Sequence, residues 1–238
     1  MVNVRIRYAL KSSAELCHAL RDEDHSWLDR AEHRELDRLR DPIRRRTWLD
    51  ARWLTKLLFC QEVGIGLSRE SLLRWRILSS SAAGRGRRPR LWRDGRELER
   101  SVSISHLSGQ VLVAFGETAG IAIGADLVAA EPLGEGFLSM WFTEREREAV
   151  LGDNDSALRV WAAKEAVYKA CNQDDGFLPR AIEILLDRQG RFSAVYRGQV
   201  LGDRCHITCW KACERFCAIA AMVPANFVSP QAVTLIPA

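Results

Sequence analysis

A long helix followed by a series of strands occurs once in each half of this 238-residue chain, and this repeated order constrains the fold more than any other feature. The first helix is predicted at residues 44–63, where apolar side chains recur at helical spacing. Gly64 and Gly66 follow it and are typical of a helix end. Strands are predicted next at residues 101–106 and 111–115, separated by a turn.

The second half repeats this order. Residues 144–171 are predicted to be largely helical, with an interrupting turn at residues 152–156. Short strands are predicted after this helix, at residues 182–186, 192–196, 206–210 and 216–222. We therefore predict an α+β fold of two similar α/β halves, a pseudo-dimer in which each half is a small, mainly antiparallel sheet packed with helices. The halves are residues 1–118 and 119–238, joined near residues 116–120.

Four further segments have a clear local pattern. Residues 2–8 alternate between apolar and polar side chains and are predicted to form a strand, and residues 13–39 form a polar helical stretch. Residues 121–126 are predicted to form a strand that ends on Asp126. Residues 79–95 are rich in Gly, Ser and Arg, which predicts an exposed, mobile loop.

The two halves differ in charge. Residues 1–118 carry a net charge of +7 and residues 119–238 a net charge of −3. Arg supplies 30 of the 35 basic residues, and its planar side chain favours two-pronged contacts with phosphate and carboxylate groups. A codon bias toward GC-rich genes produces the same excess of Arg, so the basic half is compatible with an anionic partner without requiring one.

The sequence predicts a cytoplasmic protein with reduced thiols. No segment provides the roughly 18 uncharged apolar residues that a membrane span requires, and residues 1–13 lack a signal-peptide core. The seven cysteines are an odd number without the spacing of a disulfide framework.

Cysteines recur every four residues near the C-terminal end, at Cys205, Cys209, Cys213 and Cys217. On a helix these thiols would align and suggest a zinc site. The β-forming residues on both sides of the polar segment 211–215 favour a hairpin instead, with Cys213 in its turn. The sequence contains no GxSxG, P-loop or GxGxxG motif, so hydrolase, nucleoside triphosphatase and dinucleotide-binding functions have no motif in their favour.

The most distinctive segment is WAAKEAVYK, residues 161–169. Trp161, Glu165 and Lys169 lie four residues apart on one helix face, with Lys164 on its flank. A carboxylate between two lysines suits a divalent cation and a polyphosphate bound together. The same pattern is also typical of a surface ion-pair ladder, so its interpretation depends on the motifs that accompany it.

Three other motifs precede this segment in the chain: the loop 86–89 (GRRP), Ser105 and His106 in SVSISH, and Asp126 in GAD. Together with WxxKExxxK, this order resembles the 4′-phosphopantetheinyl transferase superfamily, and in particular its surfactin-synthetase-activating, pseudo-dimeric type. The resemblance extends over roughly residues 31–223.

The resemblance implies roles in metal binding and catalysis for residues of the second half. Asp126 and Glu165 would bind Mg²⁺, which bridges the pyrophosphate of coenzyme A. Lys164 and Lys169 would contact its phosphates, and Glu165 and Lys169 would act in catalysis. Glu146 in WFTEREREAV matches a family carboxylate near the active site.

Coenzyme A contacts are implied mainly for the first half. His106 with Arg46 would hold the 3′-phosphate or neighbouring phosphates, and Ser105 belongs to the same motif. Arg88 and Pro89 would line the adenine side. Further upstream, His33 and Arg38 are weaker matches to basic residues of the family.

The implied reaction is attack by a serine hydroxyl of an apo acyl or peptidyl carrier protein on the β-phosphate of coenzyme A, with release of 3′,5′-ADP. Either Glu165 or a metal-bound water would accept the proton. The nucleophile belongs to the partner, which agrees with the absence of a nucleophile motif in this chain. Because carrier proteins are commonly acidic, the basic half could attract both partners.

One departure from the family pattern concerns the metal site. The surfactin type usually has an acidic residue two positions after the strand aspartate, where this chain has Val128. The smaller carrier-protein synthases have it one position later, where this chain has Ala129. One expected carboxylate is therefore missing, although Mg²⁺ accepts one or two protein carboxylates when waters and phosphates complete its shell.

Two other functions remain open at this stage. A coenzyme A-binding protein that kept the fold and lost catalysis would agree with Val128 and Ala129. A nucleic-acid surface on the Arg-rich half is disfavoured because acidic residues are interleaved with the basic ones in residues 15–50. We expect a monomer that binds neither nucleic acid nor membrane, because two halves in one chain would build a site that shorter relatives build between subunits.

Overall fold

A computed structural model describes residues 4–17, 25–80, 86–171, 176–187, 189–225 and 233–238. Within these residues the helices are α1 (Ser13–Cys17), α2 (Arg30–Leu36), α3 (Pro42–Glu62), α4 (Arg69–Leu73), α5 (Glu135–Trp141), α6 (Glu144–Ala149) and α7 (Asn154–Cys171), with 3₁₀ turns at Pro179–Ala181 and Gly202–Arg204. The strands are β1 (Val4–Ser12), β2 (Trp75–Ser80), β3 (Gly86–Arg93), β4 (Arg96–Leu98), β5 (Val102–Leu107), β6 (Gln110–Gly116), β7 (Ala122–Ala129), β8 (Ile182–Leu186), β9 (Phe192–Tyr196), β10 (Gln199–Val200), β11 (Cys205–Ala212), β12 (Arg215–Met222) and β13 (Val233–Pro237). No helix within the described ranges is long and apolar enough to cross a membrane.

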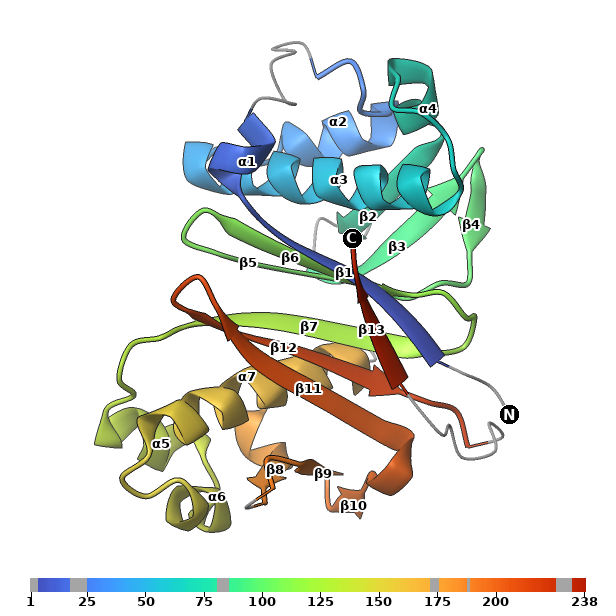
Figure 1. Ribbon diagram of the computed structural model, residues 1–238. Helices are drawn as coiled ribbons and strands as arrows, with labels where there is room; N and C mark the ends of the chain where they lie inside the picture. Colours follow the sequence, from blue (N-terminus) through green and yellow to red (C-terminus); the bar gives the residue numbers. More distant parts are fainter. Residues whose placement is uncertain (1–3, 18–24, 81–85, 172–175, 188, 226–232) are drawn as a thin grey trace.

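The molecule has four layers, with two sheets in the middle and helices outside (Figure 1). In the first half, β1, β6 and β5 form an antiparallel sheet that α3 covers, and β13 adds to β1 in parallel. In the second half, β7, β12 and β11 form an antiparallel sheet that α7 covers. The predicted α+β class with small antiparallel sheets is confirmed.

Three apolar clusters hold these layers together. One lies between α3 and the first sheet and includes Leu54 and Phe115, and another lies between α7 and the second sheet and includes Ala166 and Phe216. The third joins the two sheets through alternate residues of their strands, such as Ile123 on β7. Side chains alternate across a strand, so the other residues of β7 face α7.

The order of elements is the same in the two halves. Each begins with a strand (β1 or β7), continues through short helices to a long helix (α3 or α7), and then forms a small sheet (β2–β3–β4 or β8–β9–β10). Each ends in a hairpin (β5–β6 or β11–β12) whose second strand pairs with the first strand of the half.

Serine side chains on β5 and directly before it connect the halves. Ser101, Ser103 and Ser105 alternate along this segment, and their Oγ atoms accept hydrogen bonds from backbone N–H groups on β7, at 2.8 Å, 2.8 Å and 3.2 Å. These bonds satisfy one side of β7 without a continuous backbone ladder between the two sheets. They also bring the end of β5 next to the middle of β7.

The long helices, the strand pairs of both hairpins and the turn at Cys213 agree with the sequence predictions. The predicted loop at residues 79–95 is wrong for its second part, because β3 pairs with β2 along Arg90–Arg93 and buries Leu91 completely. The alternation of Arg90, Leu91 and Trp92 was hidden by the surrounding Arg and Gly residues. The β7 strand also continues three residues beyond Asp126. The predicted helical stretch at residues 13–39 is wrong in part, because residues 25–29 and 37–39 form turns and irregular backbone on either side of α2. Residues 2–3, 18–24 and 81–85 of the predicted elements lie outside the described ranges.

Candidate active site

Asp126 lies in the middle of β7, on the side that faces α7, and is only 3% exposed. Its Oδ1 atom accepts hydrogen bonds from Ser105 Oγ at 2.9 Å and from Lys169 Nζ at 2.6 Å. Its Oδ2 atom is buried and receives no hydrogen bond from any described residue. A buried carboxylate oxygen without a donor is unfavourable unless a proton or a cation comes to it.

Glu165 supplies the second carboxylate. It lies on α7 and interacts directly with Asp126. Burial, followed by the negative charge of Asp126, raises the pKa of Glu165 to about 7, and the Lys169 ammonium offsets part of this rise. Two buried carboxylates in contact repel each other when both are ionised, and this repulsion is unfavourable. They therefore share either a proton or a cation.

Lys169 follows Glu165 by one helical turn and connects α7 to both neighbouring strands. Its ammonium donates to Asp126 Oδ1, to the carbonyl oxygen of Ala125 at 3.0 Å and to Ser105 Oγ at 3.2 Å. Its side chain is still 28% exposed, so it can also reach a ligand in the cavity.

A cavity of about 560 Å³ opens over these groups. Its polar end is lined by Ser105, His106, Asp126, Glu165 and Lys169. As far as the structure describes the chain, its remaining lining is apolar and comes from Ile104, Leu107, Leu127, Val128, Ala129 and Trp161. A volume of this size accommodates a small organic ligand or part of a larger one.

His106 lies at the end of β5, exposed at the cavity. Partial burial and the nearby Lys169 lower the pKa of His106, and Arg44 on α3 acts in the same direction. The imidazole is therefore neutral at pH 7 without a ligand, and an anion bound beside it would favour its charged form. Arg44, in the first turn of α3, is thus within electrostatic range of His106, whereas the sequence indicated Arg46.

Lys164 does not lie where the sequence predicted. It is fully buried, and its ammonium donates to Glu146 Oε2 at 2.5 Å on the side of α7 away from the cavity. Burial lowers the pKa of Lys164, and its partner Glu146 opposes this shift. The expected phosphate contact of Lys164 is therefore replaced by a structural ion pair, and Glu146, expected near the active site, lies behind α7.

The remaining residues that the sequence indicated lie outside the cavity lining. Arg46 forms an ion pair with Asp50 at 3.0 Å on α3. Arg88 donates to Ser101 Oγ and to the carbonyl oxygen of Ile123 at 3.1 Å, and Pro89 follows it on β3. Burial lowers the pKa of Arg88.

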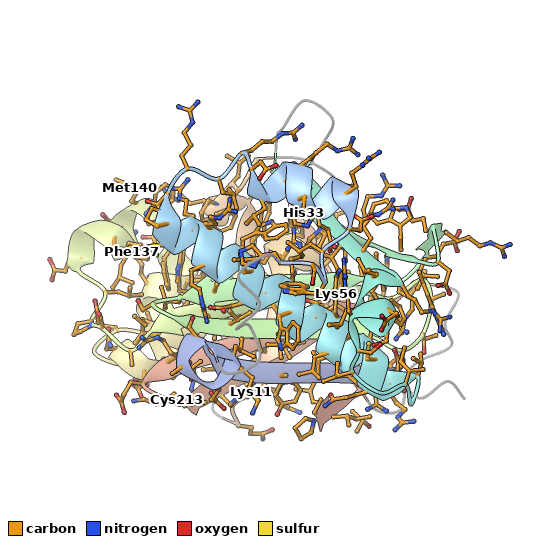
Figure 2. The ribbon with its side chains drawn as sticks, turned by 90° about the horizontal axis from the view of Figure 1, so that it is seen from above. Lys11, His33, Lys56, Phe137, Met140 and Cys213 are labelled. Atoms are coloured by element: carbon orange, nitrogen blue, oxygen red, sulfur yellow. The ribbon has the colours of Figure 1, made fainter. Side chains whose placement is uncertain are left out.

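His33 and Arg38 belong to the helical layer that covers the first half. His33 is half-buried on α2 (Figure 2), and Arg38 is exposed just after this helix. Neither residue lines the cavity as described.

Three cysteines of β11 and β12 are buried or partly buried thiols. Burial raises the pKa of Cys205, Cys209 and Cys217 to about 12, so these side chains are protonated at pH 7. They act as small apolar groups in and around the two cores of this half.

Asp126 and Glu165 fit a hard divalent cation. Within the described ranges, no three His, Cys, Asp or Glu side chains gather into a metal-binding group. Two carboxylates nevertheless suffice for Mg²⁺, which keeps several positions for water and substrate phosphates. The donor-free Oδ2 of Asp126 beside Glu165 is the observation that favours a cation here.

Magnesium is expected to raise the melting temperature more at about pH 8 than at about pH 6. Folding raises the pKa of Glu165 from 4.5 to about 7, so this group stabilises the folded state most below pH 4.5. The contribution is lost as the pH rises through about 7. At pH 6 a cation must displace the proton of Glu165 before it binds, whereas at pH 8 Glu165 is already ionised. Thermal unfolding with and without MgCl₂ at both pH values measures the difference, and an equal effect of magnesium at the two would contradict it.

The cavity thus brings together the carboxyl groups of Asp126 and Glu165 and the ammonium group of Lys169. Residues 122–221, which contain Asp126, Glu165 and Lys169, match the family model of the 4′-phosphopantetheinyl transferase superfamily. No curated protein sequence matches the chain.

Two solved structures are similar to part of the chain. The holo-[acyl-carrier-protein] synthase of Thermotoga maritima is 20% identical over 43% of this chain, with a TM-score of 0.37, and 62% of its own length is covered. The chain thus spans less than two thirds of that protein. The acyl carrier protein synthase of Mycobacterium tuberculosis is 26% identical over 44% of this chain, with a TM-score of 0.33, and is covered over its full length.

Proposed function

We propose that this protein is a Mg²⁺-dependent 4′-phosphopantetheinyl transferase that acts on apo acyl or peptidyl carrier proteins. The family-model match supports phosphopantetheine transfer in general. The observation that carries the specific proposal is the Asp126–Glu165 carboxylate pair, with Lys169 beside it, at the polar end of a 560 Å³ cavity.

Asp126 and Glu165 would hold the cation in this proposal. When bound, Mg²⁺ supplies positive charge that neutralises the phosphate oxygens of coenzyme A and stabilises the transferring group. Ser105 and Lys169 already occupy Oδ1 of Asp126, which leaves Oδ2 and the Glu165 carboxylate for the cation.

Transfer moves the phosphopantetheine group from one oxygen to another. A bond forms between the serine oxygen of the carrier protein and the β-phosphorus of coenzyme A, and the bond from this phosphorus to the bridging oxygen breaks. Glu165 would accept the serine proton, because its carboxylate lines the cavity that the serine must enter. Lys169 stabilises the negative charge that develops on the leaving 3′,5′-ADP.

The rim of the cavity would bind the nucleotide end of coenzyme A. His106 and the basic start of α3, with Arg44 and Arg46, would receive the 3′-phosphate. Arg88 and Pro89 on β3 are proposed for the adenine side, although Arg88 already donates to Ser101 and Ile123. Lys164 has no part in binding in this proposal, because it is buried against Glu146.

The repeated order of elements supports the surfactin-activating, pseudo-dimeric type and a monomeric protein. Both halves contribute to the cavity, His106 from β5 and Glu165 from α7, so a single chain can complete the site. The basic first half would attract the acidic carrier protein.

A second function, coenzyme A binding without transfer, is favoured by one observation. Val128 and Ala129 line the cavity where the family pattern has a further carboxylate, so two protein groups would hold the cation. Calorimetry with coenzyme A and Mg²⁺, followed by mass analysis of added apo carrier protein, separates the two functions. A transferase binds coenzyme A and modifies the carrier, whereas a binding protein leaves the carrier unmodified at saturating Mg²⁺.

Val128→Glu is expected to strengthen Mn²⁺ binding by about tenfold, because it adds a third charged oxygen ligand. Val128 lies two residues after Asp126 on the same face of β7 and lines the cavity. Mn²⁺ titration followed by electron paramagnetic resonance measures the affinity. Val128→Gln is the matched control, and an equal gain in both variants, or none in Val128→Glu, would argue against a cation at this position.

A further inference from the structure

Glu146 joins three elements behind the candidate active site. It is fully buried in the first turn of α6. Its Oε1 accepts from the backbone N–H of Ile184 on β8 at 2.7 Å. Its Oε2 accepts from the backbone N–H of Thr143 at 2.7 Å and from Lys164 Nζ on α7 at 2.5 Å.

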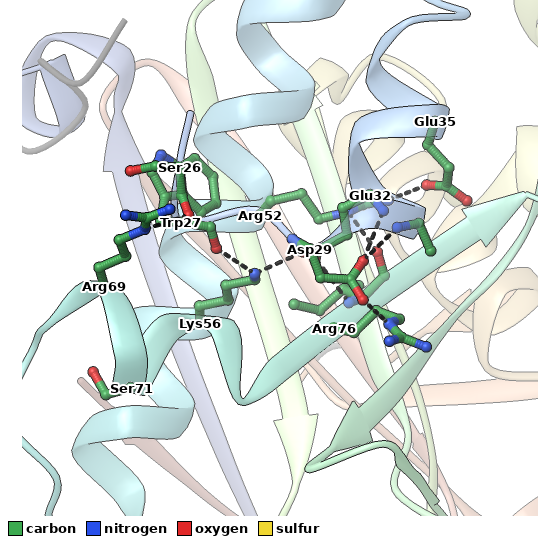
Figure 3. Close-up of polar contacts among 12 residues, drawn as sticks. Ser26, Trp27, Asp29, Glu32, Glu35, Arg52, Lys56, Arg69, Ser71 and Arg76 are labelled. Carbon is green, nitrogen blue, oxygen red and sulfur yellow. Dashed lines mark hydrogen bonds and ion pairs between the residues drawn. The ribbon is translucent and has the colours of Figure 1, made fainter. Parts of the chain in front are cut away.

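The first half contains the same arrangement (Figure 3). Glu32, fully buried in the first turn of α2, accepts at Oε1 from the backbone N–H of Ile77 on β2 at 3.0 Å. Its Oε2 accepts from the backbone N–H of Asp29 at 3.0 Å and from Lys56 Nζ on α3 at 2.6 Å. Lys56 is fully buried, as Lys164 is.

The surroundings of the two lysines are also alike. The ammonium of Lys56 lies 5.4 Å from the ring of Trp27, and that of Lys164 lies 5.3 Å from the ring of Phe142. A tryptophan precedes each lysine by three residues on its helix. The Glu–Lys pair is therefore a recurring part of the fold rather than a feature of the active site.

The two helices differ in the residues after the lysine. In α7 the next residue is Glu165, and Lys169 comes one turn later. The corresponding positions of α3 are Leu57 and Gln61. The position that corresponds to Asp126, counted from the turns of the two hairpins, is Ala9 on β1.

We infer that the Glu146–Lys164 pair positions α7 so that Glu165 and Lys169 face Asp126, which makes Lys164 a positioning residue. The opposite side of α7 already touches β7, where a Cβ at Gly124 would come within 1.8 Å of the carbonyl oxygen of Ala166. α7 also packs on β12, β11 and β8 through apolar side chains. Apolar contacts allow a helix small rolls about its axis, whereas the buried Glu146–Lys164 pair has a fixed geometry and therefore sets the rotation of α7.

A small roll has a large effect at the site. A carboxyl group about 6 Å from the helix axis moves by about 1 Å for each 10° of rotation, given the dimensions of an α-helix. A displacement of about 1 Å is enough to cost about 100-fold in a reaction that depends on positioning. The consequence for transfer rests on the proposed function, but the placement of Glu165 beside Asp126 does not.

The test compares matched double variants of the two pairs. Glu146→Gln/Lys164→Met removes both charges behind the site, and Glu32→Gln/Lys56→Met removes both charges of the corresponding pair in the first half. Crystal structures give the position of the Glu165 carboxyl group, and titration with Mn²⁺ alone gives cation affinity. Both doubles are expected to lower the melting temperature. Only Glu146→Gln/Lys164→Met is expected to move the Glu165 carboxyl group by about 1 Å and weaken Mn²⁺ binding at least tenfold, with less than a twofold change in the other.

An unmoved Glu165 carboxyl group in Glu146→Gln/Lys164→Met overturns the inference, and so do equal losses of Mn²⁺ affinity in the two doubles when the wild type binds Mn²⁺. If a double variant fails to fold, Glu146→Asp and Glu32→Asp replace them, since each shortens one side chain by a methylene and keeps the charges. The expected loss of Mn²⁺ affinity is then about threefold in Glu146→Asp alone. The position of the Glu165 carboxyl group in the crystal structures tests the inference even if the wild-type protein transfers nothing or binds no Mn²⁺. Failure of the proposed function can therefore be distinguished from failure of this inference.

Discussion

Glu165→Ala is expected to lower phosphopantetheine transfer by about 10³-fold and to leave the fold intact. Glu165 is one of two carboxylates available to the cation, and it is the group that accepts the serine proton in the proposed reaction. Its removal leaves Asp126 paired with Lys169 and Ser105, which provides no second ligand for a divalent cation. Transfer rates measured by intact mass of the carrier protein give the size of the loss.

The stability of the same variant should not fall. Glu165 is buried beside another carboxylate, which raises its pKa to about 7, so its ionised form is unfavourable at pH 8 without a cation. Glu165→Ala should therefore melt no lower than the wild type at about pH 8 without magnesium. Glu148→Ala, which removes an exposed carboxylate from α6, is the matched control and should keep full transfer activity. Similar losses of transfer in both variants, or unfolding of Glu165→Ala, would show that Glu165 is not the catalytic carboxylate.

Gly124→Ala is expected to be the most destabilising single substitution near the site, at about 4 kcal/mol or more. Gly124 lies on β7 against α7, and a Cβ there would come within 1.8 Å of the carbonyl oxygen of Ala166 and 2.6 Å of the backbone nitrogen of Ala170. Both atoms belong to the helix backbone, so no side chain can rotate away. The helix must move away from β7, which also separates Glu165 from Asp126.

Gly116→Ala provides the control for this prediction. A Cβ at Gly116 would find its nearest neighbours at 3.6 Å, which is ordinary van der Waals contact, and the expected loss is under about 1 kcal/mol. Urea unfolding of both variants measures the difference in free energy of unfolding. Equal stabilities would mean that α7 does not lie this close to β7.

Much of the fold could be predicted because its signals are local. The spacing of apolar residues identified α3 and α7, and alternation with an intervening turn identified the β5–β6 and β11–β12 hairpins. The strand at Arg90–Arg93 was missed because its arginines and nearby glycines are typical of a loop. Leu91 is buried because β3 pairs with β2. This pairing is a tertiary contact, which the local sequence does not specify.

The site could be predicted only in part for the same reason. The four-residue spacing of Glu165 and Lys169 places them on one face of a helix, but nothing local indicates that Ser105 and Asp126 lie beside them. For Lys164 the sequence predicted a contact that the structure does not contain. It follows the pattern of a phosphate-binding lysine in sequence, yet Glu146, 18 residues earlier in the chain, lies buried behind α7 and pairs with it.

Incubation of the protein with coenzyme A, MgCl₂ and several apo carrier proteins, followed by intact mass measurement, decides whether the protein transfers phosphopantetheine. We expect at least one carrier protein to gain the mass of a single phosphopantetheine group on a serine. This gain should disappear when EDTA replaces MgCl₂ and when Glu165→Ala replaces the wild type. The absence of the adduct on every carrier protein, or its formation at equal rates in the presence of EDTA, would show that the protein is not a Mg²⁺-dependent transferase.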